Sequence, residues 1–503
     1  MNPIKPTLAL RVVIPVLIGY ILLSIIGLYY HELGLEEGQQ YVFARDSHSL
    51  ADLYHNMRYE GHPRTWCILL YGIIHFITPS LVAIHILHLG ITVTTVYLFL
   101  RYAPIHRLVK IGFVFGYYFL FEYNLQNRSY ALGILLLFVS CLLLAHPDRH
   151  WPFIGILLLL LCNTDVFYAF AAVGIFLYMG FVYAQQGRLF TPPFYLLTLF
   201  FLAGVTCTYI QAQIPREDYI VHSRLNAGFS RENLASACLA LTAGWLPIPD
   251  DRLHFWNSFW IGEPANTRFL RPMLALFFLI APAFLLKAVP RALVFYYSSL
   301  LLLLGLMMVT GFTAARYFGM VVIYLLAAAW LAGNEAGATL AIAPVFRPVI
   351  GIVVLIQIGV GLYAWEQDIT RPFSQAENAV DWLKARRLNH QPVVVNGYIA
   401  GPALSTYLGK KLWYLNTGGE GSFCLWRQAY FSGPANTITG QLAVASFLPR
   451  LDSFLLLSSK NVDGPLLSDG AAGFHFTPLQ RFSDGILSME DCYMYQATRI
   501  VNH

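Results

Sequence analysis

The chain has 503 residues, of which 57 % are hydrophobic and 12 % charged, and its mean hydropathy is +0.57. A soluble protein does not carry so large an apolar share, and several apolar runs reach the ~20 residues that a helix needs to cross a bilayer. The net charge of +5 is small and fits basic loops on one membrane face. We therefore expect a polytopic α-helical membrane protein that binds no nucleic acid.

The N-terminal part sets the expected orientation. Lys5 and Arg11 precede the first apolar run, at about 12–30, and basic residues before a first span predict a cytoplasmic N-terminus. The polar segment 31–65, dense in acids, histidines and bases, is then an outer loop. The short apolar segment 65–77 that follows predicts a helix lying along the interface, or the start of a broken helix.

Further apolar runs predict the remaining membrane spans. They lie at about 80–100, 111–123, 130–145, 151–163, 166–184, 193–211, 270–286, 292–312, 317–333 and 348–365. With the first run this makes about eleven spans, an odd number that places the C-terminal region outside. Each turn predicted inside carries Arg or Lys, as the positive-inside rule requires. Residues 1–365 are thus the expected transmembrane module, with a second large outer loop over 212–268.

The C-terminal residues 366–503 have a different pattern. An amphipathic helix is predicted for QAENAVDWLKARR. Strands are predicted for PVVVNGY, SFLLLSSK and CYMYQATRI, which Gly, Pro, Asn and Asp turns separate. These elements predict a small extracytoplasmic α/β domain of about 130 residues, large enough for its own core.

Two acids follow the first span by a few residues. Glu36 and Glu37 should therefore lie near the outer membrane surface. A carboxylate there could act as a general base on an acceptor hydroxyl or amine, or orient it. The pair would also suit the first turn of a helix, where acids are favourable.

Polar residues elsewhere in the chain are candidates for binding a substrate. His62, in Gly61-His62-Pro63, could donate to a phosphate or simply belong to a turn. Arg128 and Arg316 each stand where a span meets the outer face, and a guanidinium fits a lipid phosphate, although such arginines also snorkel to headgroups. Asp165 lies between two short spans, where an acid is a functional-site hypothesis or a helix cap.

Several common site motifs are missing from the sequence. It contains no GxxxxGK[ST], GxSxG or HExxH pattern, so nucleotide hydrolysis and zinc proteolysis have no support. The seven cysteines form no metal-binding pattern. We assign no metal site and no firm cofactor.

The order of the motifs resembles a known superfamily. The motifs are LEEGQQYVFAR after the first span, GHP before the interfacial segment, NRSYALG and NTDVFYAF at later spans, and ARYFG near the last spans. In this order they resemble the GT-C superfamily of integral-membrane glycosyltransferases. The chain is most similar to the bacterial branch related to protein O-mannosyltransferases and aminoarabinose transferases. The resemblance is strongest over 10–185 and weaker at 310–335, and the C-terminal domain matches only in placement.

The resemblance implies a reaction and a location. A hexose or pentose would move from a polyprenyl-phosphate-linked donor to a lipid, glycan or protein acceptor, on the periplasmic or lumenal face and with inversion. The bacterial inner membrane would be the location, with the N-terminus cytoplasmic and the C-terminal domain periplasmic.

The resemblance also implies roles for individual residues. The first-loop acid of the family is the catalytic base, and where the family usually reads Asp-Glu this chain has Glu36-Glu37, so Glu36 is favoured with Glu37 close behind. His62, Arg128 and Tyr130 match substrate-binding positions. Asp165 departs from the Thr-His-Tyr-like hinge of the family. Many relatives work without metal, although Glu36, Glu37 and Asp165 could converge on a divalent cation.

Other functions remain open at this point. An O-antigen polymerase or ligase would use Arg and His residues of the 212–268 loop, such as His222 and Arg224. A lipid-linked sugar transporter or flippase would predict ionisable residues within several spans and a repeat between the two halves. A non-catalytic scaffold would leave the clustered first-loop acids unexplained.

Overall fold

Long apolar helices form most of the protein. The computed structural model describes residues 5–215, 228–251, 255–262, 267, 269–339, 343–396, 400–430, 438–462 and 472–500. Within these ranges seven helices are long and apolar enough to cross a membrane. They are α1 (Leu10–Tyr30), α5 (Leu81–Tyr102), α9 (Val166–Gln185), α10 (Pro192–Gln211), α15 (Pro290–Thr310), α16 (Ala315–Ala336) and α17 (Arg347–Thr370, preceded by a single turn from Pro344). The protein therefore has the composition and architecture of a multi-pass membrane protein.

Shorter apolar helices stand at the other predicted spans. These are α7 (Ser129–Leu143), α8 (Pro147–Cys162) and α14 (Leu270–Leu286). The predicted interfacial segment forms a separate twelve-residue helix, α4 (Thr65–Phe76). The run at 111–123 is not one helix, because α6 (Arg107–Val114) ends before a π-helical turn, η1 (Tyr118–Glu122).

Glycines explain the break between α6 and η1. A Cβ on Gly116 would lie 3.1 Å from the side chain of Gln357, and one on Gly361 would lie 2.6 Å from the carbonyl oxygen of Phe115. The backbone between the two short helices therefore touches α17 directly, as it can only where side chains are absent. An apolar run alone does not report such a close approach.

The second large outer loop expected over 212–268 is in part a buried helix. Helix α12 (Arg231–Trp245) packs against α14, α15 and α16. Small residues allow this, because a Cβ on Gly244 would already lie 2.6 Å from the carbonyl oxygen of Phe318. A fifteen-residue helix that begins with Arg231, Glu232 and Asn233 is too short and too polar at its start for the sequence to predict a span.

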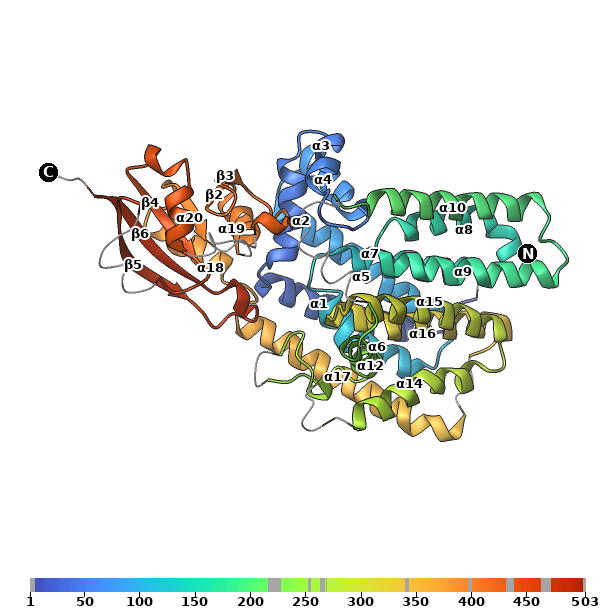
Figure 1. Ribbon diagram of the computed structural model, residues 1–503. Coiled ribbons are helices and arrows are strands. Elements are labelled where there is room, and N and C mark those ends of the chain that lie inside the picture. The colour runs from blue at the N-terminus through green and yellow to red at the C-terminus, as the bar shows by residue number, and fades with distance from the viewer. Residues whose placement is uncertain are drawn as a thin grey trace.

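The polar segment 31–65 is mostly helical. It contains α2 (Leu35–Asp46) and α3 (Leu50–Asn56), the second of which begins where the Ser49 hydroxyl accepts a hydrogen bond from the backbone N–H of Asp52 at 3.1 Å. Figure 1 shows α2 between the long helices and the C-terminal sheet. This segment is therefore the junction of the two parts of the protein.

The C-terminal part is a six-stranded mixed sheet with helices on it. Its strands lie in the order β3-β2-β1-β4-β6-β5, with β1 parallel to both β2 and β4 and the other pairs antiparallel. The strands are β1 (Val393–Asn396), β2 (Leu412–Tyr414), β3 (Gly419–Gly421), β4 (Ser453–Ser458), β5 (Phe474–Phe482) and β6 (Cys492–Arg499), and the helices are α18 (Ala376–Ala385), α19 (Gly401–Leu408) and α20 (Ile438–Val444). The predicted helix and three predicted strands are present as α18, β1, β4 and β6.

Both faces of this sheet are covered. Along β4, Leu455 and Leu457 belong to one buried cluster with residues of α18 and α19, whereas Phe454 and Leu456 belong to another on the opposite face. Successive strand side chains point to opposite faces. The continuous apolar run SFLLLS is therefore what a central strand buried on both sides requires.

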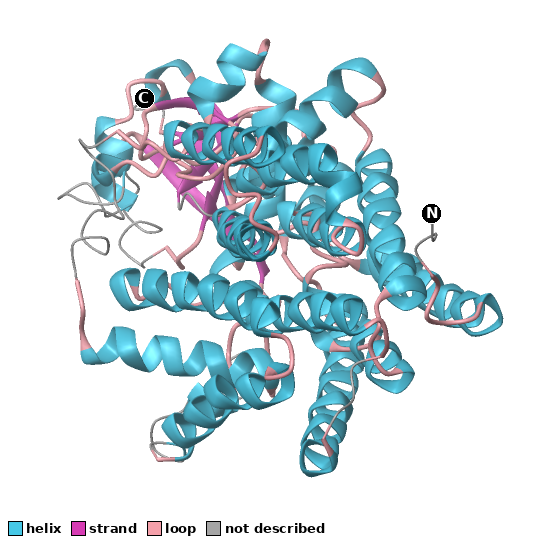
Figure 2. Cartoon of the chain, turned by 90° about the vertical axis from the view of Figure 1, so that its right-hand side faces the viewer, coloured by secondary structure: helices cyan, strands magenta, loops and turns pink. Residues whose placement is uncertain are grey.

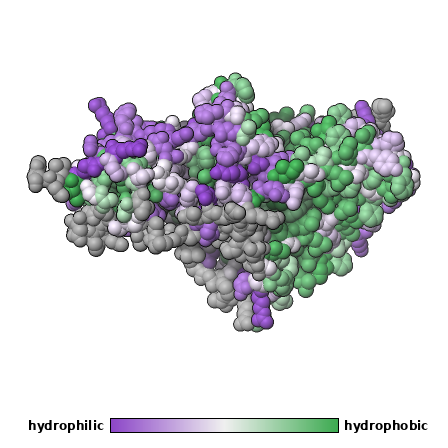
Figure 3. Space-filling model, turned by 45° about the horizontal axis from the view of Figure 1, so that its top comes forward, coloured by the Kyte–Doolittle hydropathy of each residue, from purple (hydrophilic) through white to green (hydrophobic). Residues whose placement is uncertain are grey.

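The two parts of the protein also differ in surface chemistry. Hydrophobic side chains dominate the visible surface over the long helices, and hydrophilic ones gather over the C-terminal domain and its junction with the bundle (Figure 3). Seen along the bundle from its far end, the helices lie in front of the sheet (Figure 2). The surface thus separates a membrane-compatible bundle from a water-compatible domain at one end.

Close packing of α2 on α19 joins the two parts. A Cβ on Gly38 would lie 2.7 Å from the Cα of Ala403 and 2.8 Å from its backbone nitrogen. The hydroxyl of Thr406 donates to the carbonyl oxygen of Gly38 at 3.3 Å, and Arg45 Nη1 donates to the carbonyl oxygen of Ser405 at 2.9 Å. Helix α2 therefore belongs as much to the C-terminal domain as to the bundle.

We predict that Gly38→Ala lowers the melting temperature of the purified protein. The added methyl group meets backbone, which cannot move aside, and overpacking of this kind costs about 1–3 kcal/mol. The matched control is Gly72→Ala in α4, where a Cβ meets nothing within 4 Å and alanine improves helix propensity by about 1 kcal/mol. Equal melting temperatures for the two variants would contradict the close packing of α2 on α19.

Candidate active site

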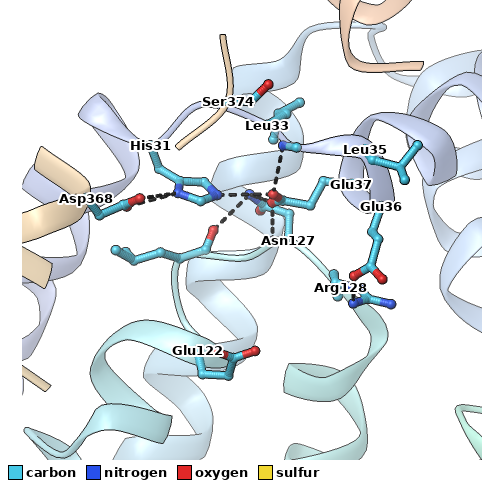
Figure 4. A network of polar contacts seen from close by, with 12 residues as sticks. His31, Leu33, Leu35, Glu36, Glu37, Glu122, Asn127, Arg128, Asp368 and Ser374 are labelled. Atoms are coloured by element: carbon cyan, nitrogen blue, oxygen red, sulfur yellow. Dashed lines mark hydrogen bonds and ion pairs between the residues drawn. The ribbon is translucent and has the colours of Figure 1, made fainter. Parts of the chain in front are cut away.

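Helix beginnings bring an acid and two arginines together. Glu36 stands in the first turn of α2, Arg128 immediately precedes α7, and Arg316 is the second residue of α16. One Glu36 oxygen forms an ion pair with Arg128 Nη1, and the other lies 2.5 Å from Arg316 Nη2 (Figure 4 shows the Arg128 contact). Residues that are 280 positions apart therefore form one charge cluster.

Aromatic rings support both guanidinium groups. The Arg128 Cζ atom lies 5.3 Å from the ring centre of Tyr130, and that of Arg316 lies 4.8 Å from the ring centre of Tyr317. The Nε atoms of both arginines are buried without a hydrogen-bond partner among the described residues. Each arginine thus has one N–H donor that no described acceptor satisfies.

The charge of Glu36 is stabilised by its neighbours. Burial alone would raise the pKa of the Glu36 carboxyl, but Arg128, Arg316 and His62 outweigh it and hold the pKa below its usual value. The Glu36 side chain is 36 % exposed, against 4 % for Glu37. Of the two acids, Glu36 is the one that a ligand can reach.

His62 and Asp165 lie at the edge of the same cluster. Burial and the nearby arginines lower the pKa of His62, although Asp165 and Glu36 act in the opposite direction. The Asp165 carboxylate caps α9 by accepting from the Phe167 N–H at 3.3 Å, so its possible capping role is the one the structure contains. Six of the seven residues singled out from the sequence lie in or directly before the first turns of α2, α7, α9 and α16, and His62 lies in the loop before α4. The phenol of Tyr168, in α9, donates to the backbone carbonyl of Tyr130 at 2.7 Å.

Glu37 has a different environment from Glu36. Its carboxylate accepts hydrogen bonds from the backbone N–H groups of Asn127 at 2.6 Å and Gly34 at 3.3 Å, and it lies 3.1 Å from His31 Nε2. The other His31 nitrogen, Nδ1, lies 2.9 Å from a carboxylate oxygen of Asp368 at the end of α17. Figure 4 shows this row of Asp368, His31, Glu37 and Asn127.

The geometry requires a protonated His31. Carboxylates only accept hydrogen bonds, so an imidazole between two of them uses both nitrogens as donors and is positively charged. Burial would lower the pKa of His31, but the charges of Asp368 and Glu37 raise it well above its usual value. The ends of α1 and α17 and the start of α2 are therefore joined by one buried cation.

The C-terminal domain supplies hydrogen-bond acceptors for backbone N–H groups at and just before the start of α2. Glu490 accepts a hydrogen bond from the backbone N–H of Leu35 at 2.7 Å, and the Ser374 hydroxyl donates to the other Glu490 oxygen at 2.7 Å. The phenol of Tyr407 accepts from the N–H of Leu33 at 2.7 Å. Free N–H groups of a helix start need such acceptors, and here residues from the far end of the chain supply them.

A further carboxyl with raised pKa lies two residues before His62 in the chain. Glu60 accepts hydrogen bonds from Gln39 Nε2 at 2.7 Å and from Trp426 Nε1 at 3.0 Å. Burial raises the pKa of Glu60 to about 7. This carboxyl links the loop before α4 to both α2 and the C-terminal domain.

Sequence reasoning missed several of these residues. His31 and Asp368 sit one residue after α1 and two residues before the end of α17, where nothing in the sequence relates them. Glu122 could have been found, because an acid inside the apolar run 111–123 is a functional-site hypothesis by default. Glu490 gives no sequence signal, since its role depends on the folded domain.

The structure tests the expectation of a shared cation site but not that of a polymerase or ligase site. Within the described ranges, no three His, Cys, Asp or Glu side chains are grouped so as to hold a metal ion. The structure thus gives Glu36, Glu37 and Asp165 separate partners and does not gather them around a cation site. His222 and Arg224, the residues of the polymerase or ligase alternative, lie outside the described residues.

No family model, curated protein or solved structure matches this chain.

We predict that His31→Gln destabilises the protein by about 3–5 kcal/mol, because it leaves two buried carboxylates without their cation. A histidine whose native pKa is raised contributes stability that is fully present below about pH 6.5 and is lost as pH rises through the native pKa. Melting curves of the wild type should therefore show this loss at alkaline pH, and those of His31→Gln should not.

His55→Gln, at an exposed position on α3, is the control for this prediction and should melt like the wild type. Parallel pH profiles for His31→Gln and the wild type would show that His31 is not the titrating group.

Proposed function

We propose that the protein is a glycosyltransferase of the GT-C type, which moves a sugar from a polyprenyl-phosphate-linked donor to an acceptor. The observation that carries the proposal is the Glu36 carboxylate between Arg128 and Arg316, at the junction of an apolar bundle and a water-compatible domain. A lipid phosphate needs cations near the membrane surface, and transfer needs a base beside them.

The arginine pair is suited to the leaving group. During transfer the bond between the anomeric carbon and the phosphate oxygen breaks, so a phosphodiester becomes a phosphomonoester and its negative charge grows. Arg128 and Arg316 would therefore bind the departing polyprenyl phosphate more strongly than the donor, which is the condition for lowering the barrier. The buried Nε groups supply additional donors.

Glu36 is the better candidate for the base. The acceptor O–H or N–H would attack the anomeric carbon from the side opposite the phosphate, inverting it, while its proton passes to a Glu36 oxygen. Glu37 is buried and holds His31 and two backbone N–H groups, so we assign it to positioning α2. The choice of Glu36 over Glu37 therefore rests on the contacts of the two side chains and not on the Glu36-Glu37 sequence motif.

The ion pairs also suggest how donor binding activates the base. A phosphate that takes over the two guanidinium groups would release Glu36 and remove the charges that hold its pKa low. The carboxylate would then be more basic when the donor is present than when the site is empty. Proton removal from the acceptor is thereby linked to the presence of donor.

The same proposal includes the finer topology. With the N-terminus in the cytoplasm, as Lys5 and Arg11 favour, eleven crossings would place residues 366–503 in the periplasm, with the protein in a bacterial inner membrane. Residues 1–365 would be the catalytic module, and His62, Tyr130 and Asp165 would line the substrate site around the arginines. The acceptor would be a lipid, a glycan or a protein.

We predict that Glu36→Gln lowers transfer by about 10²–10⁴-fold, the range that general bases contribute, while binding polyprenyl phosphate more tightly than the wild type. The tighter binding follows because glutamine no longer neutralises the arginines. Purified protein, radiolabelled polyprenyl-phosphate sugars and a titration with polyprenyl phosphate measure both effects. Full activity of Glu36→Gln would exclude this base.

We predict that Arg316→Gln weakens polyprenyl phosphate binding at least tenfold, because a charge-assisted bidentate contact is lost. Arg107→Gln, an exposed position at the start of α6, is the control and should leave binding unchanged. If Arg316→Gln binds normally and wild type transfers no sugar from any donor, transport of a lipid-linked sugar becomes the function to test.

A further inference from the structure

A buried carboxyl that the proposed reaction does not use lies beside the arginines. Glu122, 2 % exposed, ends the π-helical turn η1. The next residue, Tyr123, donates its hydroxyl to the carbonyl oxygen of Arg316 at 2.5 Å. Asn257 Oδ1 accepts from the N–H of Ala315 at 2.6 Å, and its neighbour Trp256 donates from Nε1 to Glu122 Oε2 at 3.1 Å. Glu122 is thus held against the start of α16.

A chain of contacts connects Glu122 with Glu37. The Trp256 ring lies edge-on to Phe373 with centres 5.5 Å apart, and the Phe373 ring lies 4.7 Å from that of His31. His31 binds Glu37, and Glu37 binds the N–H of Asn127. Figure 4 shows Glu122 on the turn below this row, on the same side as Arg128.

Several polar atoms on or next to this chain of contacts have no hydrogen-bond partner among the described residues. Glu122 Oε2 accepts from Trp256 and, at 2.9 Å, from the Tyr117 hydroxyl. Glu122 Oε1, Gln126 Nε2 and Asn127 Oδ1 are buried without a hydrogen-bond partner among the described residues. Buried polar atoms are almost always paired. Three such atoms, two acceptors and one donor, lie within six residues of the sequence, and a ligand that brings both kinds of group would satisfy them.

We propose that Glu122, Gln126 and Asn127 form the subsite for the sugar ring of the donor, next to the arginines that take its phosphate. This inference rests on the proposed function and deepens it. Sugar hydroxyls both donate and accept, so they match two acceptors and a donor.

The test compares two ligands on the full-length protein in detergent. Dissociation constants are measured for decaprenyl phosphate and for its mannosyl, glucosyl, galactosyl and arabinosyl derivatives. Glu122→Gln keeps an oxygen for Trp256 and Tyr117 but turns the free acceptor into a donor. We expect it to weaken the best glycosylated ligand about tenfold and to leave decaprenyl phosphate unchanged within about twofold.

Two further variants keep the test decisive. Gln126→Met removes the unpaired donor at similar volume and should show the same selective loss. Glu420→Gln, exposed on β3, should bind both ligands like the wild type. An unchanged ratio of the two dissociation constants in both Glu122→Gln and Gln126→Met overturns the subsite.

The wild type separates this inference from the proposed function. If it binds decaprenyl phosphate and every glycosylated form equally well, the subsite is wrong and the phosphate site remains. If it binds neither kind of lipid, both the subsite and the proposed function are wrong.

Discussion

A buried imidazolium between two carboxylates is the interaction on which the rest of the structure depends. His31 directly follows α1, Glu37 lies in the first turn of α2 and Asp368 lies near the end of α17. Removing ions from water is costly unless charge and hydrogen bonds are matched, and here both nitrogens have a carboxylate. The interaction leaves little freedom in where α2 begins, and the position of α2 in turn determines where Glu36 meets the arginines that open α7 and α16. By binding Glu37, His31 keeps that acid buried, while the adjacent Glu36 stays partly exposed.

The charge cluster is balanced differently from the histidine bridge. Two arginines contact one carboxylate beside the starts of α7 and α16, and helix starts favour anions. In the histidine bridge both ring nitrogens have a carboxylate partner, whereas in the charge cluster the Nε atoms of both arginines have no hydrogen-bond partner among the described residues. Two consecutive residues thus belong to different networks, Glu37 to the histidine bridge and Glu36 to the charge cluster.

The sequence predicted the class of fold, most helices and the identity of the charged cluster, because apolar run length and intramembrane charge are local signals. It did not predict α12, a short helix with a polar N-terminal turn whose small residues allow close packing, or the break at Gly116, which depends on the facing helix. It found Arg128 and Arg316 but could not show that both contact one oxygen pair. Partners such as Asp368 and Glu490 depend on tertiary contacts, which no local sequence pattern predicts. Glu122 is different, because an acid inside an apolar run is a local signal of a functional site.

The cap on α2 has a consequence for biosynthesis. Leu35 receives its hydrogen-bond acceptor from Glu490, which is 455 residues later in the chain. A polypeptide emerges from the ribosome from its N-terminus, so the first helix and the acids after it are made long before this partner exists. The helix that carries Glu36 would therefore remain incompletely ordered in the nascent chain. Such an order of assembly would make the formation of the charge cluster one of the last events in maturation.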